Sequence, residues 1–159
     1  MKLIILIVFL LGVDQWTKEL VARSMFEGDT IGILNDFFHI TYVKNHGMAF
    51  GMFQGEIKTI SIVAIVAILG IIYFMIKQLK PHEVISKYAY AFILAGAIGN
   101  MIDRIYRGFV VDFLDFRGLW KFVFNMADVW INIGVFLLIL EVIILERKKK
   151  HKKINSFLK

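Results

Sequence analysis

The chain has 159 residues, 58% of them hydrophobic, with a mean hydropathy of +0.70 and a formal net charge of +6. Soluble domains are about 45–50% apolar, so this composition indicates an integral membrane protein and excludes an ordinary soluble domain. The sequence contains no cysteine, which excludes a disulfide framework, a thiolate metal site and a lipid attached to cysteine.

Four apolar stretches lie at about residues 3–21, 57–76, 88–106 and 124–145. Each is close to the length of about 20 residues that a membrane-spanning helix needs. Together they leave no room for a separate soluble domain. We therefore expect an all-α integral membrane protein with four transmembrane helices, built as one membrane domain over residues 1–159.

The first stretch begins like a cleavable signal peptide, because Lys2 precedes an apolar run. Ala22 and Ser24 also supply small residues at the spacing of a cleavage site. However, Asp14, Lys18 and Glu19 interrupt the approach to that site. We therefore expect this stretch to remain in the protein as its first helix.

Basic residues indicate the orientation in the membrane. They occur at Lys2, between residues 77 and 87, and in the tail at residues 147–159. By the positive-inside rule these segments are cytoplasmic, which places both termini inside. Nucleic-acid binding would also explain a basic tail in isolation, but its position directly after a spanning helix favours contact with anionic lipid.

This orientation places residues 22–56 and 107–123 outside the cytoplasm. Residues 37–43 are rich in aromatic and β-branched side chains, which predicts a strand, and a glycine-bearing turn follows at residues 45–51. We expect a small extracytoplasmic β-subdomain at the membrane surface, with aromatic side chains at the interface.

Polar residues recur at helical spacing in three of the apolar stretches. They are Asp14 and Lys18 in the first, Gly96, Asn100 and Asp103 in the third, and Asn125, Asp128 and Asn132 in the fourth. Carboxylates and amides at membrane depth are costly and do not face lipid, so we expect the three polar stripes to face one another. All three lie near the outer ends of their helices, which predicts a site open to external water.

Paired aspartates can hydrolyse a peptide bond without a metal. Two adjacent carboxyl groups share one proton, so that the ionised member activates water and the protonated member polarises the carbonyl group. Asp14 has Lys18 one turn away, and Asp103 precedes Arg104 and lies one turn before Arg107, so both invite interpretation as ion-paired helix residues.

Asp112 and Asp128 have no basic residue three or four positions away, which leaves them freer for chemistry. Spacing alone does not decide which two aspartates form a pair. Three alternatives remain at this point. Asp112, Asp128, Asn100 and Asn125 offer oxygen ligands for a metal ion, the carboxylates could line an ion or proton pathway, or they could be purely structural.

Five segments together resemble the lipoprotein signal peptidases (signal peptidase II), which are bacterial membrane aspartyl proteases. The segments are DQWTK at 14–18, NHGMAFG at 45–51, AGAIGNMIDR at 95–104, GFVVDF at 108–113 and FNMAD at 124–128. They occur in the family's order and cover nearly the whole chain. Other membrane aspartyl proteases would carry Gly-x-Gly-Asp, which is absent here.

The resemblance implies cleavage of a prolipoprotein before its diacylglyceryl-modified cysteine, in the bacterial cytoplasmic membrane, by a monomer without metal or cofactor. It assigns catalysis to Asp112 and Asp128. Residues that support the site or bind substrate would be Asp14, Lys18, Asn45, Gly47, Phe50, Asn100, Asp103, Arg104 and Asn125. Phe50 and Phe53 are candidates for a lid over the site, or else for ordinary interfacial anchors.

Overall fold

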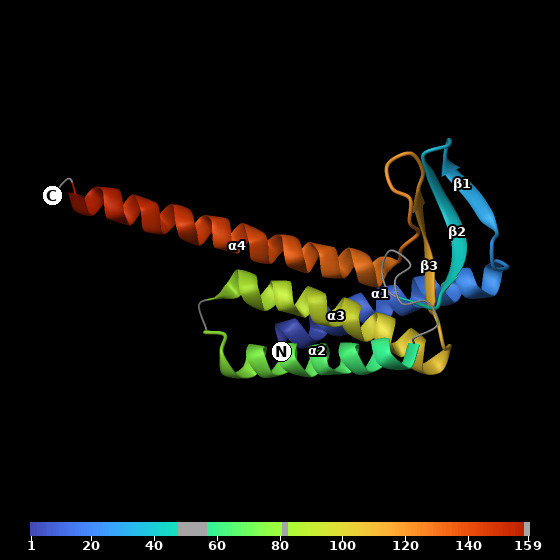
Figure 1. Cartoon of the computed structure of the whole chain (residues 1–159), viewed down its shortest axis with the longest axis horizontal. Helices are drawn as coiled ribbons and strands as arrows, with labels where there is room; N and C mark the ends of the chain where they lie inside the picture. Colours follow the sequence, from blue (N-terminus) through green and yellow to red (C-terminus); the bar gives the residue numbers. More distant parts are fainter. Residues whose placement is uncertain (48–56, 81–82, 158–159) are drawn as a thin grey trace.

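A computed structural model describes residues 1–47, 57–80 and 83–157. Phe50 and Phe53, the candidate lid residues, lie outside this described part of the chain. In chain order the elements are α1 (Lys2–Ser24), β1 (Thr30–Leu34), β2 (Phe38–Asn45), α2 (Ile57–Lys77), α3 (Val84–Tyr106), β3 (Val110–Phe116) and α4 (Met126–Phe157). The protein is mostly helical, and a small sheet stands at the end of the helices where α1 ends and α4 begins (Figure 1).

Three helices are long and apolar enough to cross a membrane: α2, α3, and α4 as far as Lys148. With 23 residues α1 is also long enough, but Asp14, Lys18 and Glu19 reduce its hydropathy. Three of the four expected membrane-spanning helices therefore meet the criteria of length and hydropathy. α1 meets the criterion of length but has too many charged residues to meet the criterion of composition.

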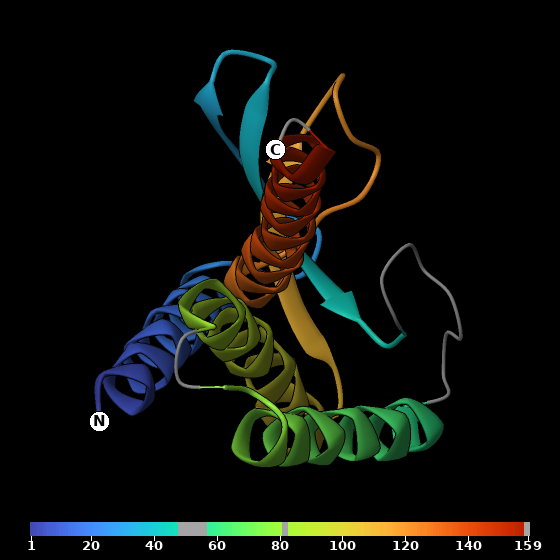
Figure 2. The same cartoon turned by 90° about the vertical axis from the view of Figure 1, so that its left-hand side faces the viewer.

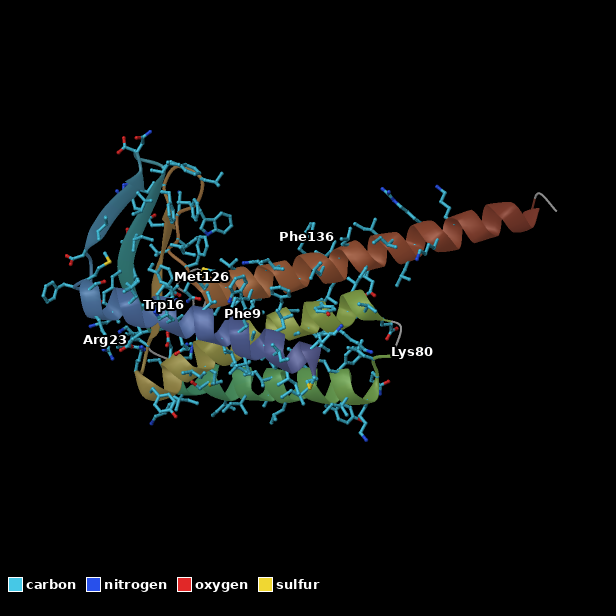
Figure 3. The ribbon with its side chains drawn as sticks, turned by 180° about the vertical axis from the view of Figure 1, so that it is seen from behind. Phe9, Trp16, Arg23, Lys80, Met126 and Phe136 are labelled. Atoms are coloured by element: carbon cyan, nitrogen blue, oxygen red, sulfur yellow. The ribbon has the colours of Figure 1, made fainter. Side chains whose placement is uncertain are left out.

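The polar stripe of α1 faces the protein interior, and several large apolar side chains are exposed on the other side of the helix. Asp14 and Lys18 are fully buried, whereas Phe9 and Trp16 are exposed. Figure 3 shows Phe9 and Trp16 on the outer side of α1, and Phe136 in a similar position on α4. The outer surface of the helices is therefore apolar, as a lipid-facing surface requires.

The central helix is α3, which contacts α1, α2 and α4 (Figure 2). Its contact with α4 is close because glycines leave room for the neighbouring backbone. A Cβ atom at Gly96 would collide with the carbonyl oxygen of Ala127, and one at Gly134 would lie 2.5 Å from the carbonyl oxygen of Ala89. Small residues therefore bring α3 and α4 together.

The sheet has the antiparallel order β1-β2-β3. The predicted strand at residues 37–43 corresponds to β2. Neither β1 nor β3 was predicted. Asp112, in the segment between the third and fourth apolar stretches, lies in β3 opposite Val43 of β2. The expectation of a small sheet is confirmed, but the strand that carries Asp112 was missed.

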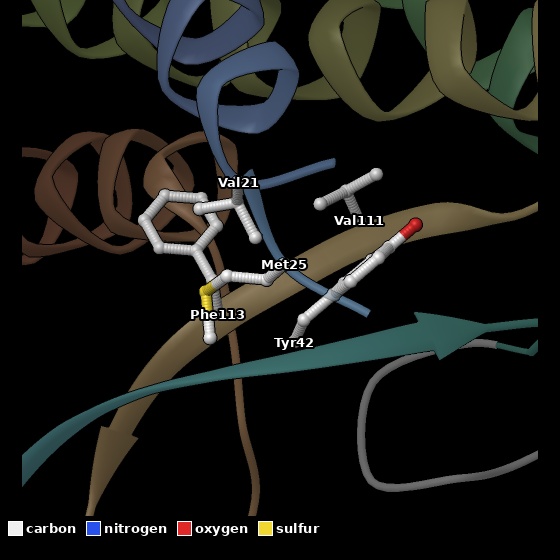
Figure 4. Packing of buried hydrophobic residues seen from close by; sticks show 5 residues of the cluster. All are labelled: Val21, Met25, Tyr42, Val111 and Phe113. Carbon is white, nitrogen blue, oxygen red and sulfur yellow. The ribbon is translucent and has the colours of Figure 1, made fainter. Parts of the chain in front are cut away.

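A buried apolar cluster fastens the sheet to the end of α1. It contains Val21 and Met25 from α1 and its end, Tyr42 from β2, and Val111 and Phe113 from β3 (Figure 4). Because successive side chains of a strand point to opposite faces, the packing of Val111 and Phe113 turns the residue between them the other way. The cluster thus orients the side chain at position 112.

Candidate active site

The chain segment before α4 is bound to β3. The backbone N–H groups of Phe113 and Leu114 donate to the carbonyl oxygen of Phe124 at 2.9 and 2.7 Å, and the N–H of Phe124 donates back to Leu114 at 3.1 Å. These bonds place Asn125 and the first turn of α4 beside Asp112. Residues 112 and 128 are thereby brought to one place by the local fold.

Asn125 and Asp128 hold each other at the start of α4. The backbone N–H of Asn125 donates to Asp128 Oδ2 at 3.2 Å, and the backbone N–H of Asp128 donates to Asn125 Oδ1 at 3.1 Å. This reciprocal arrangement is that of a capping box. The partial positive charge of the helix N-terminus also favours a carboxylate here.

Asn125 also binds the second carboxylate. Its Nδ2 donates to Asp112 Oδ1 at 2.6 Å, while Asn45 Nδ2 donates to Asp112 Oδ2 at 2.9 Å. On the other carboxylate, Asn100 Nδ2 donates to Asp128 Oδ1 at 2.9 Å. Each of the four carboxylate oxygens of the pair therefore accepts a hydrogen bond from an N–H group.

The two carboxylates differ in their surroundings. Asp112 is only 3% exposed, whereas Asp128 is half-buried. Burial and then the negative charge of Asp128 raise the pKa of Asp112 to about 7, against the opposing effects of hydrogen bonds from Asn45 and Asn125 and of the charge of Lys18. Near neutral pH the pair is thus suited to hold one proton between its two members.

The expected ion pair between Asp14 and Lys18 is confirmed, with Lys18 Nζ 3.0 Å from Asp14 Oδ2. Asp103 pairs with Lys18 at 3.4 Å and with Arg107 at 3.3 Å. In the part of the chain that the structure describes, no ion pair includes Asp112 or Asp128. The interpretation of the four aspartates by their basic neighbours therefore agrees with the geometry.

Arg104 follows Asp103 in the sequence, but its hydrogen bonds are with backbone carbonyl groups. Its Nη1 and Nη2 donate to the carbonyl oxygens of Asn100 at 3.3 Å and Gly47 at 3.1 Å. Gly47 in turn donates its backbone N–H to Asn45 Oδ1 at 2.9 Å. Arg104 thus links α3 to the end of β2, next to the asparagine that binds Asp112.

One residue of the site was missed and one expected orientation was wrong. Gln15, within the first motif, donates to Asp14 Oδ2 at 3.0 Å and to the carbonyl oxygen of Gly99 at 3.1 Å. Asn132 does not face the other polar stripes: it is exposed, and its amide donates to the carbonyl oxygen of Asp128 in its own helix. Gln15 could have been predicted as part of the site because it directly follows Asp14 in the sequence.

The donor set around the two carboxylates does not suit a metal ion. The amide oxygens of Asn100 and Asn125, two of the oxygens considered as ligands, accept hydrogen bonds from Lys18 Nζ and from the backbone N–H of Asp128. Among the described residues no three or more His, Cys, Asp or Glu side chains are grouped as metal ligands. Asn100 and Asn125 are therefore arranged as hydrogen-bond partners of the two carboxylates and not as ligands of a metal ion.

These features define a helical membrane protein with two carboxylates bridged by one asparagine at one end of its helices. Residues 6–144 match the family model described as signal peptidase (SPase) II. The chain belongs to this family of signal peptidases, and the resemblance that the five motifs indicated is confirmed.

Individual relatives match over almost the whole chain. The lipoprotein signal peptidase of Fusobacterium nucleatum is 50% identical over 149 residues, which are 94% of this chain and 90% of that protein. The lipoprotein signal peptidase of Clostridioides difficile is 38% identical over 150 residues, 94% of this chain and 100% of that protein.

Two solved structures of bacterial membrane enzymes, determined by the in meso method at 2.3 and 1.9 Å resolution, have TM-scores of 0.84 and 0.81 to this structure. Each is 35% identical and covers 89% of this chain, and the matches span 87% and 92% of those chains. At this identity and coverage, the fold is shared with a membrane enzyme.

Proposed function

We propose that the protein is an aspartic endopeptidase that removes the signal peptide from prolipoproteins by cleaving before the diacylglyceryl-modified cysteine. Family membership and relatives named lipoprotein signal peptidases support the substrate class. The observation that carries the aspartic mechanism is the bridging of Asp112 and Asp128 by Asn125.

In this mechanism Asp128 is ionised and takes a proton from the attacking water, because it is the more exposed member and lies at a helix N-terminus. Buried Asp112 holds the shared proton and donates it to the scissile carbonyl oxygen as the water oxygen bonds to the carbonyl carbon. Collapse of the tetrahedral intermediate breaks the C–N bond. The proton held by Asp128 passes to the leaving amine, and one hydroxyl group of the intermediate returns its proton to Asp112 as the new carboxyl group forms.

The residues around the pair keep it in place. Asn100 and Asn125 hold Asp128, while Asn45 holds Asp112 and is itself held by Gly47. The assignment of Phe50 to substrate binding rests on the sequence motif alone.

We place α1 in the membrane as the fourth span. Its charged residues Asp14 and Lys18 are fully buried against α3 and α4, so lipid would contact mainly its apolar side. The basic residues near the ends of the helices remote from the sheet support cytoplasmic termini and a site at the extracytoplasmic face. The enzyme would act as a monomer, with prolipoproteins and membrane lipid as partners.

Purified protein in detergent tests this function against a diacylglyceryl-modified prolipoprotein. The expected products are the free signal peptide and a mature chain whose mass begins at the lipidated cysteine. A strong chelator should leave the rate unchanged, because no step uses a metal ion. A cut at any other bond, or activity that is lost on chelation and restored by a divalent cation, would contradict the proposal.

A further inference from the structure

Lys18 is a fully buried cation that is bound by three partners from two helices. Its Nζ lies 3.0 Å from Asp14 Oδ2, 3.4 Å from Asp103 Oδ2 and 2.9 Å from Asn100 Oδ1. An ammonium group has three N–H donors, so these three oxygens account for its donor capacity. A charge buried in this way is retained only with such compensation.

Asp14 connects Lys18 to the backbone next to Asp128. While its Oδ2 faces Lys18, its Oδ1 accepts the backbone N–H of Ala127 at 2.8 Å. Ala127 is the residue directly before Asp128. The position of the Asp128 backbone therefore depends on a carboxylate that is held by Lys18.

Asp103 repeats the same construction toward Asp112. Its Oδ2 faces Lys18 and accepts the backbone N–H of Val111 at 3.0 Å. Val111 is the residue directly before Asp112. One cation thus holds two carboxylates, and each carboxylate binds the backbone next to one member of the pair.

The third partner acts on the carboxylate of Asp128 itself. An ammonium group only donates, so Asn100 must turn its Oδ1 toward Lys18. This orientation leaves Asn100 Nδ2 facing Asp128 Oδ1, to which it donates at 2.9 Å. Without Lys18 the amide could rotate and present an oxygen to the carboxylate.

We propose that Lys18 is the positioning residue that sets the relative placement of Asp112 and Asp128, acting through Asp14, Asp103 and Asn100. The inference rests on the proposed proteolytic function of the pair. Lys18 contacts the two carboxylates that bind the backbone N–H groups of Ala127 and Val111. It also contacts the asparagine that orients Asp128. It contributes geometry to the site in addition to charge balance.

A charge-matched double variant separates positioning from stability. Lys18→Met alone leaves Asp14 and Asp103 buried without their shared cation, so we expect reduced stability. Adding Asp14→Asn returns the cluster to one net negative charge, as in the wild type, and Asn keeps an oxygen for the Ala127 N–H. The double variant should regain folding but not turnover.

The measurements are kcat, KM and the pH profile of kcat on monodisperse protein in detergent. For Lys18→Met/Asp14→Asn we expect kcat to fall by about 100-fold or more, as for small misplacements of reacting groups, with KM changed by less than about threefold. The alkaline limb of the profile, which reports Asp112, should move to higher pH, since the charge of Lys18 lowers the pKa of Asp112 and is absent from the variant. Arg23→Met, which removes an exposed side chain paired with Glu19, is the matched control and should keep wild-type values.

The charged groups around Lys18 and the pair must be considered together in reading the pH profile. They are Asp14 on α1, Asp103, Arg104 and Arg107 on α3, Asp112 on β3 and Asp128 on α4. Only the first of these is altered in the double variant, so a shift in the profile reports the loss of Lys18 and Asp14 alone. The pH profile of the single variant Asp14→Asn shows how much of the shift comes from the substitution of Asp14, so the remainder comes from the loss of Lys18.

The outcomes distinguish this inference from the proposed function. If the double variant folds and turns over like the wild type, Lys18 only neutralises charge and the inference is overturned. If the double variant does not fold, Asp14→Asn alone must still lower kcat with KM unchanged, and wild-type kcat in that variant overturns the inference. No cleavage by the wild type, or full cleavage by Asp112→Asn, would instead overturn the proposed function.

Discussion

Asn125 binds Asp112 through its side chain, Nδ2 to Oδ1 at 2.6 Å, and binds Asp128 through its backbone N–H. One residue therefore sets the distance between a strand carboxylate and a helix carboxylate. Its own position follows from the hydrogen bonds between Phe124 and β3.

Asn125→Ala should disable the site more than it destabilises the fold. It removes the donor to Asp112 and the acceptor for the Asp128 N–H, so we expect kcat to fall about 100-fold. Loss of the cap should lower the free energy of unfolding by about 1 kcal/mol. Steady-state kinetics and thermal unfolding in detergent measure the two effects, and wild-type kcat in a folded variant would refute the bridging role.

The pH dependence of activity should show an alkaline limb near neutrality. The pKa of Asp112 is raised to about 7, so its proton is lost as the pH rises through that value and the general acid disappears. We expect kcat/KM to fall above pH about 7. A rate that stays constant up to pH 9 would show that Asp112 supplies no proton.

The same shift predicts a change of stability with pH. Asp112 has a higher pKa in the folded protein than its ordinary value of 3.8, so the folded state binds more protons between pH 3.8 and about 7. The stabilisation is complete below this window and is lost as the pH rises through it, by on the order of 4 kcal/mol. Unfolding curves at several pH values should show a smaller dependence of stability on pH for Asp112→Asn than for the wild type.

Gly99 is required for the approach of α1 to α3. A Cβ atom there would collide with Asp14 Oδ2 and lie 3.4 Å from the Cβ of Ala127. Gly99→Ala should therefore displace Asp14 from Lys18 and lower both the melting temperature and kcat. Gly70 on α2 has no atom within 4 Å of such a Cβ, so Gly70→Ala is the control and should retain both values. Equal behaviour of the two variants would contradict the packing argument.

The fourth span can be tested by thiol labelling, because the chain has no cysteine of its own. Single cysteines at Lys2, Phe26 and Lys150, all exposed, report the two ends of α1 and the tail. An impermeant reagent added to intact cells should label position 26 and leave positions 2 and 150 unlabelled until the cells are opened. Labelling of positions 2 and 26 from the same side would show that α1 does not cross the membrane.

The ion pair of Asp14 with Lys18 was predictable because it lies within one helix, where residues four apart are neighbours. The contacts of Asp14 with Ala127 and of Asp103 with Val111 were not predictable, since their partners are backbone N–H groups that any residue supplies. These contacts depend on how α1, α3, β3 and α4 pack, which local spacing does not reveal.

Two further errors have local causes. β3 was missed because Asp112 interrupts a short apolar run without regular alternation, as its buried neighbours on both sides show. Asn132 was expected to face inward, but α4 contacts α3 through Ala127, Ile131 and Gly134. That stripe is one residue, or about 100°, away from Asp128 and Asn132, so these two residues lie at its border.

The most direct test of the account compares Asp112→Asn and Asp128→Asn with the wild type in cleavage of a diacylglyceryl-modified prolipoprotein. Each variant keeps the size of its side chain, and Asp115→Asn provides a β3 control outside the pair. We expect both variants to elute and melt as folded protein while cleavage falls to background, with Asp115→Asn remaining active. Cleavage near the wild-type rate by either folded variant would contradict the assignment of Asp112 and Asp128 as the catalytic pair.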